Sequence, residues 1–422
     1  MYSYNKQFYH GFAMVLTLVV GLTIVGPATV IAEDQTGGVP GDWLSRYMGA
    51  RTAGVGGSYV AMANDPLGVV WNPAGLSYMS QNEIYLETSR LFEDTSINGF
   101  SFGMPARRFP SFGISVLNLR SGEFDRRSDL NEPLGDFNES DMAFLFSASK
   151  HFSRRFAVGT NVKVVRQSVD EFDGTGVGLD LGLLYHITPA LRVGASLLNL
   201  GGPNLTLRDT EEQFPVEFRG GFALQFFHGR GLISAELDHR EGPGVSFHGG
   251  SEFWVYRGMA LRFGYADQYP AGGFSYRVTP AMRFDYAAAD NELGVTHRFG
   301  MSYKFGGFFA SSEAVPPIFS PIGQQSVTKF HLKAKTKADA ESWRLEIVDK
   351  SNQVVRQFGG KGVPPAHVMW DGKDESGLSL PDGVYHYHLV VIDRERREFV
   401  AHERTVEITT EGPQGSVPVY TD

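Results

Sequence analysis

Hydrophobic and polar residues alternate with a period of two through the middle of this chain. At 177–185, Val177, Leu179, Leu181, Leu183 and Tyr185 alternate with Gly178, Asp180, Gly182 and Leu184. Similar alternation recurs at 259–265, 282–287 and 299–305. Successive side chains of a strand point to opposite faces, so each segment predicts a strand with one apolar face and one small, polar or charged face.

The pattern predicts about fourteen strands, with twelve and sixteen as alternative counts. Their expected ranges are 82–89, 97–105, 111–119, 141–150, 155–168, 175–186, 191–198, 215–226, 231–239, 245–255, 259–266, 272–277, 281–289 and 295–305. A soluble sandwich would bury the apolar faces in a shared core, whereas a membrane barrel would turn them to lipid. The alternation alone does not separate these two architectures.

The connections between the predicted strands fall into two sets. One set is short and basic or proline-containing, at 106–110, 151–154, 187–190, 227–230, 256–258 and 278–280. The other set is as long or longer and mostly acidic, at 90–96, 120–140, 169–174, 199–214, 240–244, 267–271 and 290–294. Short turns on one rim and long loops on the other are typical of outer-membrane barrels. We therefore expect an all-β protein with an antiparallel transmembrane barrel at 81–308, both ends of which reach the short-turn rim.

Other segments flank the expected barrel. Lys6, the apolar run that follows it and a small-residue site ending at Ala32 predict a signal peptide at 1–32, the alternative being an uncleaved membrane anchor. A glycine-rich segment at 41–80 is expected to form a plug. A proline-containing linker is expected at 309–326, before a small β-sandwich at 327–410.

Composition narrows the range of functions. The 422 residues carry a net charge of -9, which argues against nucleic acid as a partner. The absence of cysteine excludes disulfides, thiol catalysis and cysteine-based zinc sites. The twelve histidines show no metal-ligand spacing, so no metal is expected.

Three motifs suggest chemistry that their surroundings do not favour. Ser101 lies in a G-x-S-x-G pattern, but within a predicted strand and with no helix after it. The glycines at 54–57 follow no strand, so phosphate binding is not favoured there. The stretch 371–377 has its glycine one position too late for a calcium loop. We therefore expect no catalytic residue and no cofactor, and a protein that is not an enzyme.

Residues 41–80 contain many small residues, together with residues that start and stop helices. Asn72 before Pro73 is a suitable N-cap pair for a short helix at 73–78, and Asp65-Pro66 breaks the segment before it. Glycines permit close backbone contact, which suits a plug against or inside a barrel wall. The residues singled out are Gly49, Arg51, Gly54, Gly56, Gly57, Asp65, Pro66, Trp71, Asn72, Pro73 and Gly75.

These motifs resemble the start of the PorV/PorQ family of outer-membrane proteins, relatives of the FadL-type long-chain fatty-acid transporters. The resemblance rests on Gly49-Ala50-Arg51, Gly54-Val55-Gly56-Gly57, Asn64-Asp65-Pro66 and Trp71-Asn72-Pro73-Ala74-Gly75-Leu76, and it covers about residues 41–306. It implies either export and surface attachment of proteins, as in type IX secretion, or passage of hydrophobic small molecules.

Five charged residues fall on the predicted interior face of the barrel: Asp180, Arg192, Arg262, Arg283 and Asp285. They can fill the lumen as neutralising pairs, or they can line a translocation path. Both interpretations stay open at this point.

The stretch 370–387 resembles the immunoglobulin-like (Ig-like) module of the hook-capping protein FlgD. The resemblance implies a sandwich with Trp370 in its core and turns at Asp371-Gly372 and Asp382-Gly383. Gly377, Pro381 and Tyr385 complete the motif. The even strand count predicts that this module lies in the periplasm.

Three functions remain as hypotheses. The first is a barrel for export or surface attachment of proteins, the second a channel for hydrophobic small molecules, and the third a structural envelope tether acting through the distal module. The expected partners are outer-membrane lipid, secreted or periplasmic proteins, and hydrophobic small molecules.

Overall fold

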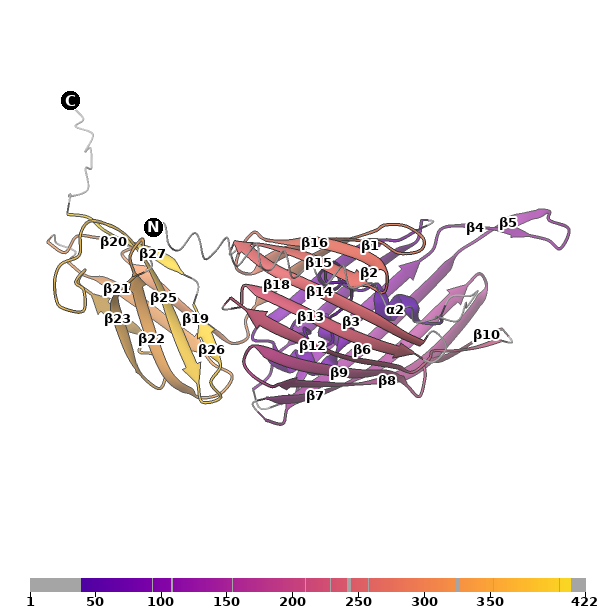
Figure 1. Cartoon of the computed structure of the whole chain (residues 1–422), viewed down its shortest axis with the longest axis horizontal. Coiled ribbons are helices and arrows are strands. Elements are labelled where there is room, and N and C mark those ends of the chain that lie inside the picture. The colour runs from indigo at the N-terminus through magenta and orange to yellow at the C-terminus, as the bar shows by residue number, and fades with distance from the viewer. Residues whose placement is uncertain are drawn as a thin grey trace, which may run out of the picture.

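The computed structural model describes residues 39–410 apart from 93, 108, 154, 209, 228, 241–243, 257, 323–325, 352 and 402. The predicted signal peptide at 1–32 and the alternative membrane anchor lie outside these residues. Within them, no helix is both long and apolar enough to cross a bilayer. Figure 1 shows a barrel with a smaller β module beside one of its ends.

Fourteen antiparallel strands close the barrel, and each pairs with its neighbours in chain order. They are β1 (Asn82–Arg90), β2 (Ser96–Met104), β3 (Ser111–Arg120), β6 (Glu139–His151), β7 (Phe156–Val169), β8 (Phe172–His186), β9 (Leu191–Leu200), β12 (Glu217–Phe226), β13 (Gly231–Arg240), β14 (Gly244–Tyr256), β15 (Met259–Ala266), β16 (Tyr269–Arg277), β17 (Met282–Ala289) and β18 (Thr296–Phe305). The predicted ranges agree with these within three residues. Asn82 of β1 lies opposite Phe305 of β18, so both ends of the barrel meet on the short-turn rim.

The apolar face of the strands is the outer face of the barrel. Val177, Leu181 and Phe263 are 55%, 45% and 57% exposed, whereas the intervening Asp180 is 1% exposed. A soluble sandwich would bury the apolar set, so these exposures exclude it. The wall faces lipid, and the predicted all-β transmembrane barrel is confirmed.

The loops on the long-loop rim differ from one another more than the sequence predicts. The long loops 120–140 and 199–214 carry hairpins of their own, β4 (Phe124–Arg127) with β5 (Pro133–Phe137) and β10 (Asn204–Leu207) with β11 (Thr210–Gln213). The loops expected at 169–174 and 267–271 are instead two-residue turns, because β8 and β16 begin earlier than predicted. Asp170 and Asp267 take the positive φ that such tight turns require, 57° and 53°.

Short helical elements lie inside the barrel (Figure 1, indigo). They are α2 (Asp42–Arg46), α3 (Ala50–Gly54), α4 (Gly68–Trp71) and the 3-10 helix η1 (Pro73–Tyr78). The predicted short helix at 73–78 is confirmed, and the Asn72 side chain accepts a hydrogen bond from the Ala74 amide as its cap. We call the segment 41–80 the plug.

Glycines on the inner face of the wall make room for the plug. A Cβ at Gly182 would lie 2.2 Å from the Asn72 side chain, and one at Gly194 would lie 2.5 Å from the Val60 carbonyl oxygen. The wall glycines in such contact with plug atoms are Gly99, Gly103, Gly113, Gly159, Gly182, Gly194, Gly250 and Gly264. The plug therefore touches the backbone of the wall directly, at distances that no larger residue allows.

The distal module is a two-sheet sandwich. One sheet has the order β19 (Phe309–Val315), β21 (Thr328–Lys335), β24 (His367–Trp370). The other contains β20 (Ile318–Phe319), β27 (Arg404–Ile408), β25 (Gly383–Asp393), β22 (Ala340–Val348) and β23 (Val354–Lys361), with β26 (Glu398–Val400) beside β25. The segment 309–326, expected to be a linker, instead supplies β19 and β20. Ala310, Ser312 and Ala314 alternate along β19 and pack one face of it against this core. The pattern is short and its side chains are small, so the neighbouring prolines suggested a linker instead.

Replacing Gly250 with valine should dislodge the plug, because a Cβ at this position would lie 2.4 Å from the Val55 carbonyl oxygen. Overpacking of this kind costs about 1–3 kcal/mol. We expect a lower thermal midpoint in detergent and faster trypsin cleavage after Arg46 or Arg51. Gly249→Val is the matched control, since a Cβ there meets nothing closer than 3.6 Å. Equal effects of the two variants would contradict direct plug contact.

Candidate functional site

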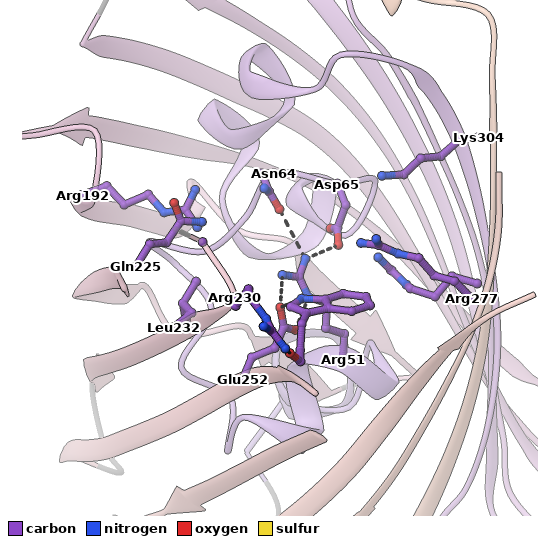
Figure 2. A pocket seen from close by; sticks show the side chains of 13 residues that line it. Arg51, Asn64, Asp65, Arg192, Gln225, Arg230, Leu232, Glu252, Arg277 and Lys304 are labelled. Atoms are coloured by element: carbon purple, nitrogen blue, oxygen red, sulfur yellow. Dashed lines mark hydrogen bonds and ion pairs between the residues drawn. The ribbon is translucent and has the colours of Figure 1, made fainter. Parts of the chain in front are cut away.

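Arg51 of α3 joins the plug to the barrel wall. Its guanidinium donates to both carboxylate oxygens of Glu252 on β14, from Nε at 2.9 Å and from Nη2 at 3.1 Å. Its Nη1 donates to Asp65 of the plug at 3.0 Å. Arg51 is 8% exposed, so these charge-assisted bonds form away from bulk water, where bidentate geometry is strongest. Figure 2 shows Arg51 between Glu252 on one side and Asn64 and Asp65 on the other.

The loop after α3 is fixed by two carboxylates. The Tyr59 hydroxyl donates to Asp65 at 2.6 Å within the plug. The backbone amides of Tyr59 and Val60 each donate to Glu236 of β13 at 2.7 Å. A wall carboxylate thus satisfies two plug amides that would otherwise be buried without partners.

The structure brings three of the five predicted interior residues into one network. Arg262 pairs with Glu252 at 2.8 Å and with Asp285 at 3.4 Å, and Arg283 pairs with Asp285 at 3.0 Å. Arg51 meets the same network through Glu252, so the plug is part of it. For these residues the interpretation as paired filling describes the structure.

Asp180 and Arg192 lie apart from this network. Asp180 forms a buried ion pair with Lys163 at 2.6 Å and accepts a hydrogen bond from the Asn199 amide at 2.9 Å. Arg192 is 7% exposed, and within the described residues its Nε and Nη2 have no hydrogen-bond partner. It therefore does not fit the interpretation as paired filling.

A cavity of about 190 Å³ lies between the plug and the wall in the short-turn half of the barrel (Figure 2). Its lining consists of Arg51, Asn64, Asp65, Arg192, Gln225, Gly229, Arg230, Leu232, Glu252, Trp254, Arg277, Arg283 and Lys304. Six of these side chains are cationic and two are anionic, so the cavity is strongly polar and positively charged.

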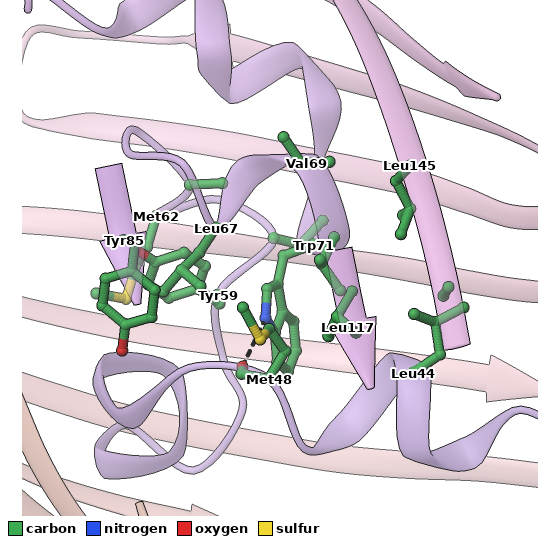
Figure 3. Packing of buried hydrophobic residues seen from close by; sticks show 14 of the residues in the cluster. Leu44, Met48, Tyr59, Met62, Leu67, Val69, Trp71, Tyr85, Leu117 and Leu145 are labelled. Atoms are coloured by element: carbon green, nitrogen blue, oxygen red, sulfur yellow. Dashed lines mark hydrogen bonds between the residues drawn. The ribbon is translucent and has the colours of Figure 1, made fainter. Parts of the chain in front are cut away.

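The long-loop half of the lumen contains an apolar cluster. Trp43 and Leu44 of α2 belong to a buried cluster with Leu117 of β3 and Phe214 of the loop before β12. Figure 3 shows this cluster around Trp71, whose indole nitrogen donates to the Met48 carbonyl at 3.0 Å. Charged side chains lie in the same half, among them the buried pair Arg219–Glu217 and Arg240, which pairs with Asp42. The apolar cluster therefore shares the long-loop half with ion pairs.

The plug residues singled out from the sequence lie in the lumen, and all but the half-buried Gly57 are buried. Asn72 donates to the carbonyls of Val60 and of Leu183 on β8 at 2.8 and 3.0 Å, joining plug and wall. Gly49, Gly56 and Gly57 take positive φ. The others are Arg51, Gly54, Asp65, Pro66, Trp71, Pro73 and Gly75. They share one small volume although they span 27 positions of the sequence.

The motifs judged unfavourable for chemistry lie in ordinary structural surroundings. Ser101 is buried in the middle of β2 and shares a hydrogen bond of 2.6 Å with Ser115 of β3. Asp374 caps its own turn by accepting from the Ser376 and Leu378 amides, each at 2.9 Å. Over the described part of the chain, no three His, Asp or Glu side chains gather as a metal site would require.

In the distal module, Trp370 is 1% exposed and its ring contacts those of Phe319, Phe330 and Tyr385. Gly372, Gly377 and Gly383 take positive φ at the turns, and Asp371 is exposed beside the first of them. The Tyr385 hydroxyl donates to the Pro381 carbonyl at 2.7 Å.

The module contacts the short-turn rim of the barrel. The Lys337 amine donates to the carbonyl of Ser77 in η1, and Asp339 pairs with Arg107 in the turn between β2 and β3. Burial, followed by the nearby Arg397 guanidinium, lowers the pKa of the Lys337 amine to about 8. The end of the plug is therefore in direct contact with the module.

The family model of the FlgD Ig-like domain matches residues 320–393. The distal module is a FlgD-type Ig-like domain. The matched range includes β20, in keeping with the finding that the segment before 327 contributes to the sandwich.

Among solved structures, the toluene transporter TbuX of Ralstonia pickettii is 17% identical over 62% of this chain and 99% of its own, with a TM-score of 0.49. A deltaS2 mutant of TodX, a monoaromatic hydrocarbon channel from Pseudomonas putida, is 13% identical over 62% of this chain and 100% of its own, with a TM-score of 0.50. A FadL homologue of Pseudomonas aeruginosa is 12% identical over 61% and 98%, with a TM-score of 0.47. The likeness to TodX shows a shared fold, that of an outer-membrane barrel. No curated protein matches the sequence, and the resemblance to PorV/PorQ stays a prediction.

Sequence reasoning missed the wall residues that hold the plug, above all Glu236 and Glu252. Both glutamates alternate with outward-facing apolar residues in strands that were correctly predicted. The alternation therefore could have placed their side chains in the lumen. Their plug partners are two backbone amides and an arginine that lie 176, 177 and 201 positions away, so no local pattern reveals them.

Replacing Arg51 with glutamine should destabilise the barrel by about 3–5 kcal/mol, because it removes one partner from buried carboxylates. Thermal or denaturant unfolding of the purified protein in detergent measures the loss. Arg166→Gln is the control, since Arg166 pairs with Asp173 at 3.4 Å with both side chains more than half exposed. Such surface pairs contribute less than about 1 kcal/mol. A loss at Arg51 no larger than the control would show that the buried network does not hold the plug.

Proposed function

We propose that the protein is a plugged, non-enzymatic channel that passes small hydrophobic molecules across the outer membrane. In this proposal the short-turn rim and the FlgD-type module face the periplasm. The observation that carries it is the apolar cluster around α2 in the long-loop half of the lumen. A hydrophobic solute gains free energy on leaving water for such a cluster, in proportion to the apolar area that it buries.

The contacts of the plug suggest which part of it moves. Asp42 of α2 pairs with Arg240, and Arg46 donates to Ser246 at 3.4 Å, both at the long-loop rim. Arg51 and the loop after it lie deeper and are tied to Glu252 and Glu236. Displacement of α2 would expose the apolar cluster while the buried network keeps the rest of the plug in place.

The shared fold gives independent support. TodX is a monoaromatic hydrocarbon channel, and its barrel has the same fold as this one. Fold alone does not determine function, so the apolar cluster in this lumen remains the main argument.

Replacing Leu117 with glutamine should slow hydrophobic uptake about fivefold to tenfold, because it places an amide in the apolar cluster. Leu117→Met keeps the volume and the apolar character and should transport normally. The measurement is the initial uptake of labelled toluene by intact cells that express the protein and lack other such channels. Uptake equal to that of cells without the protein would refute the channel function.

A second candidate is export or surface attachment of proteins, as the resemblance to PorV/PorQ implies. The observation in its favour is the position of the FlgD-type module, which touches the end of the plug through Lys337 and the rim through Asp339. A domain placed there can couple a bound protein to the barrel.

Crosslinking in cells followed by purification and mass spectrometry tests this second function. Export predicts stoichiometric secreted partners, which should be lost in Asp339→Lys because like charges then face each other at Arg107. Asp125→Lys, in the exposed β4–β5 hairpin, is the control. Partners that persist in Asp339→Lys would favour the tether hypothesis, and the absence of protein partners would exclude both.

A further inference from the structure

The cavity in the short-turn half contains more positive than negative charge. Its lining has six cationic side chains, Arg51, Arg192, Arg230, Arg277, Arg283 and Lys304, against Asp65 and Glu252. Both acids already pair with Arg51. Adding the neighbouring Glu83, Asp285 and Arg262 gives seven cations and four anions in the whole network. These groups together therefore carry a surplus of three positive charges.

Arg192 is the clearest sign that a ligand is needed. It lines the cavity from β9, is 7% exposed, and its Nε and Nη2 have no hydrogen-bond partner among the described residues. Figure 2 shows it on the opposite side of the cavity from Arg277 and Lys304. Burying a guanidinium without a counter-charge costs several kcal/mol, which an anion between these side chains would offset.

The other arginines are held in place around the opening. Arg230 donates to the carbonyls of Trp254 and Val255 at 3.2 and 2.7 Å. The Arg277 guanidinium lies 3.8 Å from the centre of the Trp254 ring, and the Trp254 indole donates to Glu252 at 3.3 Å. The lining is thus ordered before any ligand arrives, which lowers the entropic cost of binding.

We propose that this cavity binds a small, multiply charged oxyanion of the phosphate type, reached from the short-turn rim past the exposed Arg230. Planar guanidinium groups suit the paired oxygens of phosphate, and three surplus charges suit a dianion or trianion better than a halide. At about 190 Å³ the cavity is smaller than the usual pocket for a drug-sized ligand, so it fits phosphate or a short phosphate monoester and not an acyl chain or a peptide. The inference goes beyond the channel function and does not depend on it.

Calorimetric titration of the full chain with inorganic phosphate, in phospholipid-free detergent and at constant ionic strength, tests the proposal. We expect saturable binding to the wild type that chloride does not reproduce. Arg192→Gln should weaken it at least about tenfold, the effect of losing hydrogen bonds to a charged group, and Arg192→Lys should weaken it less. Arg155→Gln removes one charge from an exposed site on the same rim outside the cavity and should leave binding unchanged.

A stability measurement keeps the test independent of folding defects. Phosphate should raise the thermal midpoint of the wild type and of Arg155→Gln, but not that of Arg192→Gln, which should itself be at least as stable as the wild type without phosphate. Absence of binding, or equal weakening by Arg155→Gln, would overturn the proposal. A midpoint shift only in nanodiscs that contain phosphatidylglycerol would identify a lipid headgroup and overturn the assignment to a soluble anion. Toluene uptake, measured separately, reports on the channel alone.

Discussion

The outer face of the barrel must be apolar because it meets lipid, so nearly every charge that the strands carry has to point inward. Successive side chains of a strand point to only two faces, so a charge that cannot face lipid must face the lumen. The lumen therefore collects buried acids such as Glu236 and Glu252 and buried bases such as Arg262. A charged lumen of this kind needs partners, and the plug supplies them: the Arg51 guanidinium for Glu252 and two backbone amides for Glu236. The plug is thus an electrostatic component of the barrel as well as a steric one.

Wall glycines and wall carboxylates have different roles in positioning the plug. Glycines on the wall, such as Gly194 and Gly250, set where the plug backbone can approach. Carboxylates on the same strands or on neighbouring strands determine which plug groups bind there, because they accept hydrogen bonds from those groups. Neither would suffice alone, because a close approach without hydrogen-bonding partners would bury unpaired amides, and partners without space would produce overlap.

Alternation predicted the fourteen strands and the inward side of Asp180 and Arg262, and the Asn72-Pro73 pair predicted the cap, because each depends on residues close in sequence. The Arg51–Glu252 pair joins positions 201 apart, and the cavity draws on seven strands and one turn as well as the plug, so no local pattern predicts them. The segment before 327 was mistaken for a linker because its prolines stand beside two short strands. Local rules thus predict the wall of this protein, and only the closed barrel reveals what the wall encloses.

The two ends of the plug are held differently, and this gives a direction to any opening. At the short-turn rim, η1 contacts the wall closely, and its Ser77 carbonyl accepts a hydrogen bond from Lys337 of the module. At the long-loop rim, α2 is held by the apolar cluster and by contacts of Asp42 and Arg46 close to solvent. Apolar contacts can be replaced by an incoming hydrophobic molecule at little net cost, and Arg240 still has Glu217 at 4.0 Å when Asp42 leaves. Breaking the buried Arg51 network, in contrast, leaves charges without partners. If the plug moves, its long-loop end should therefore move first. The cationic cavity is then the last compartment before the short-turn rim.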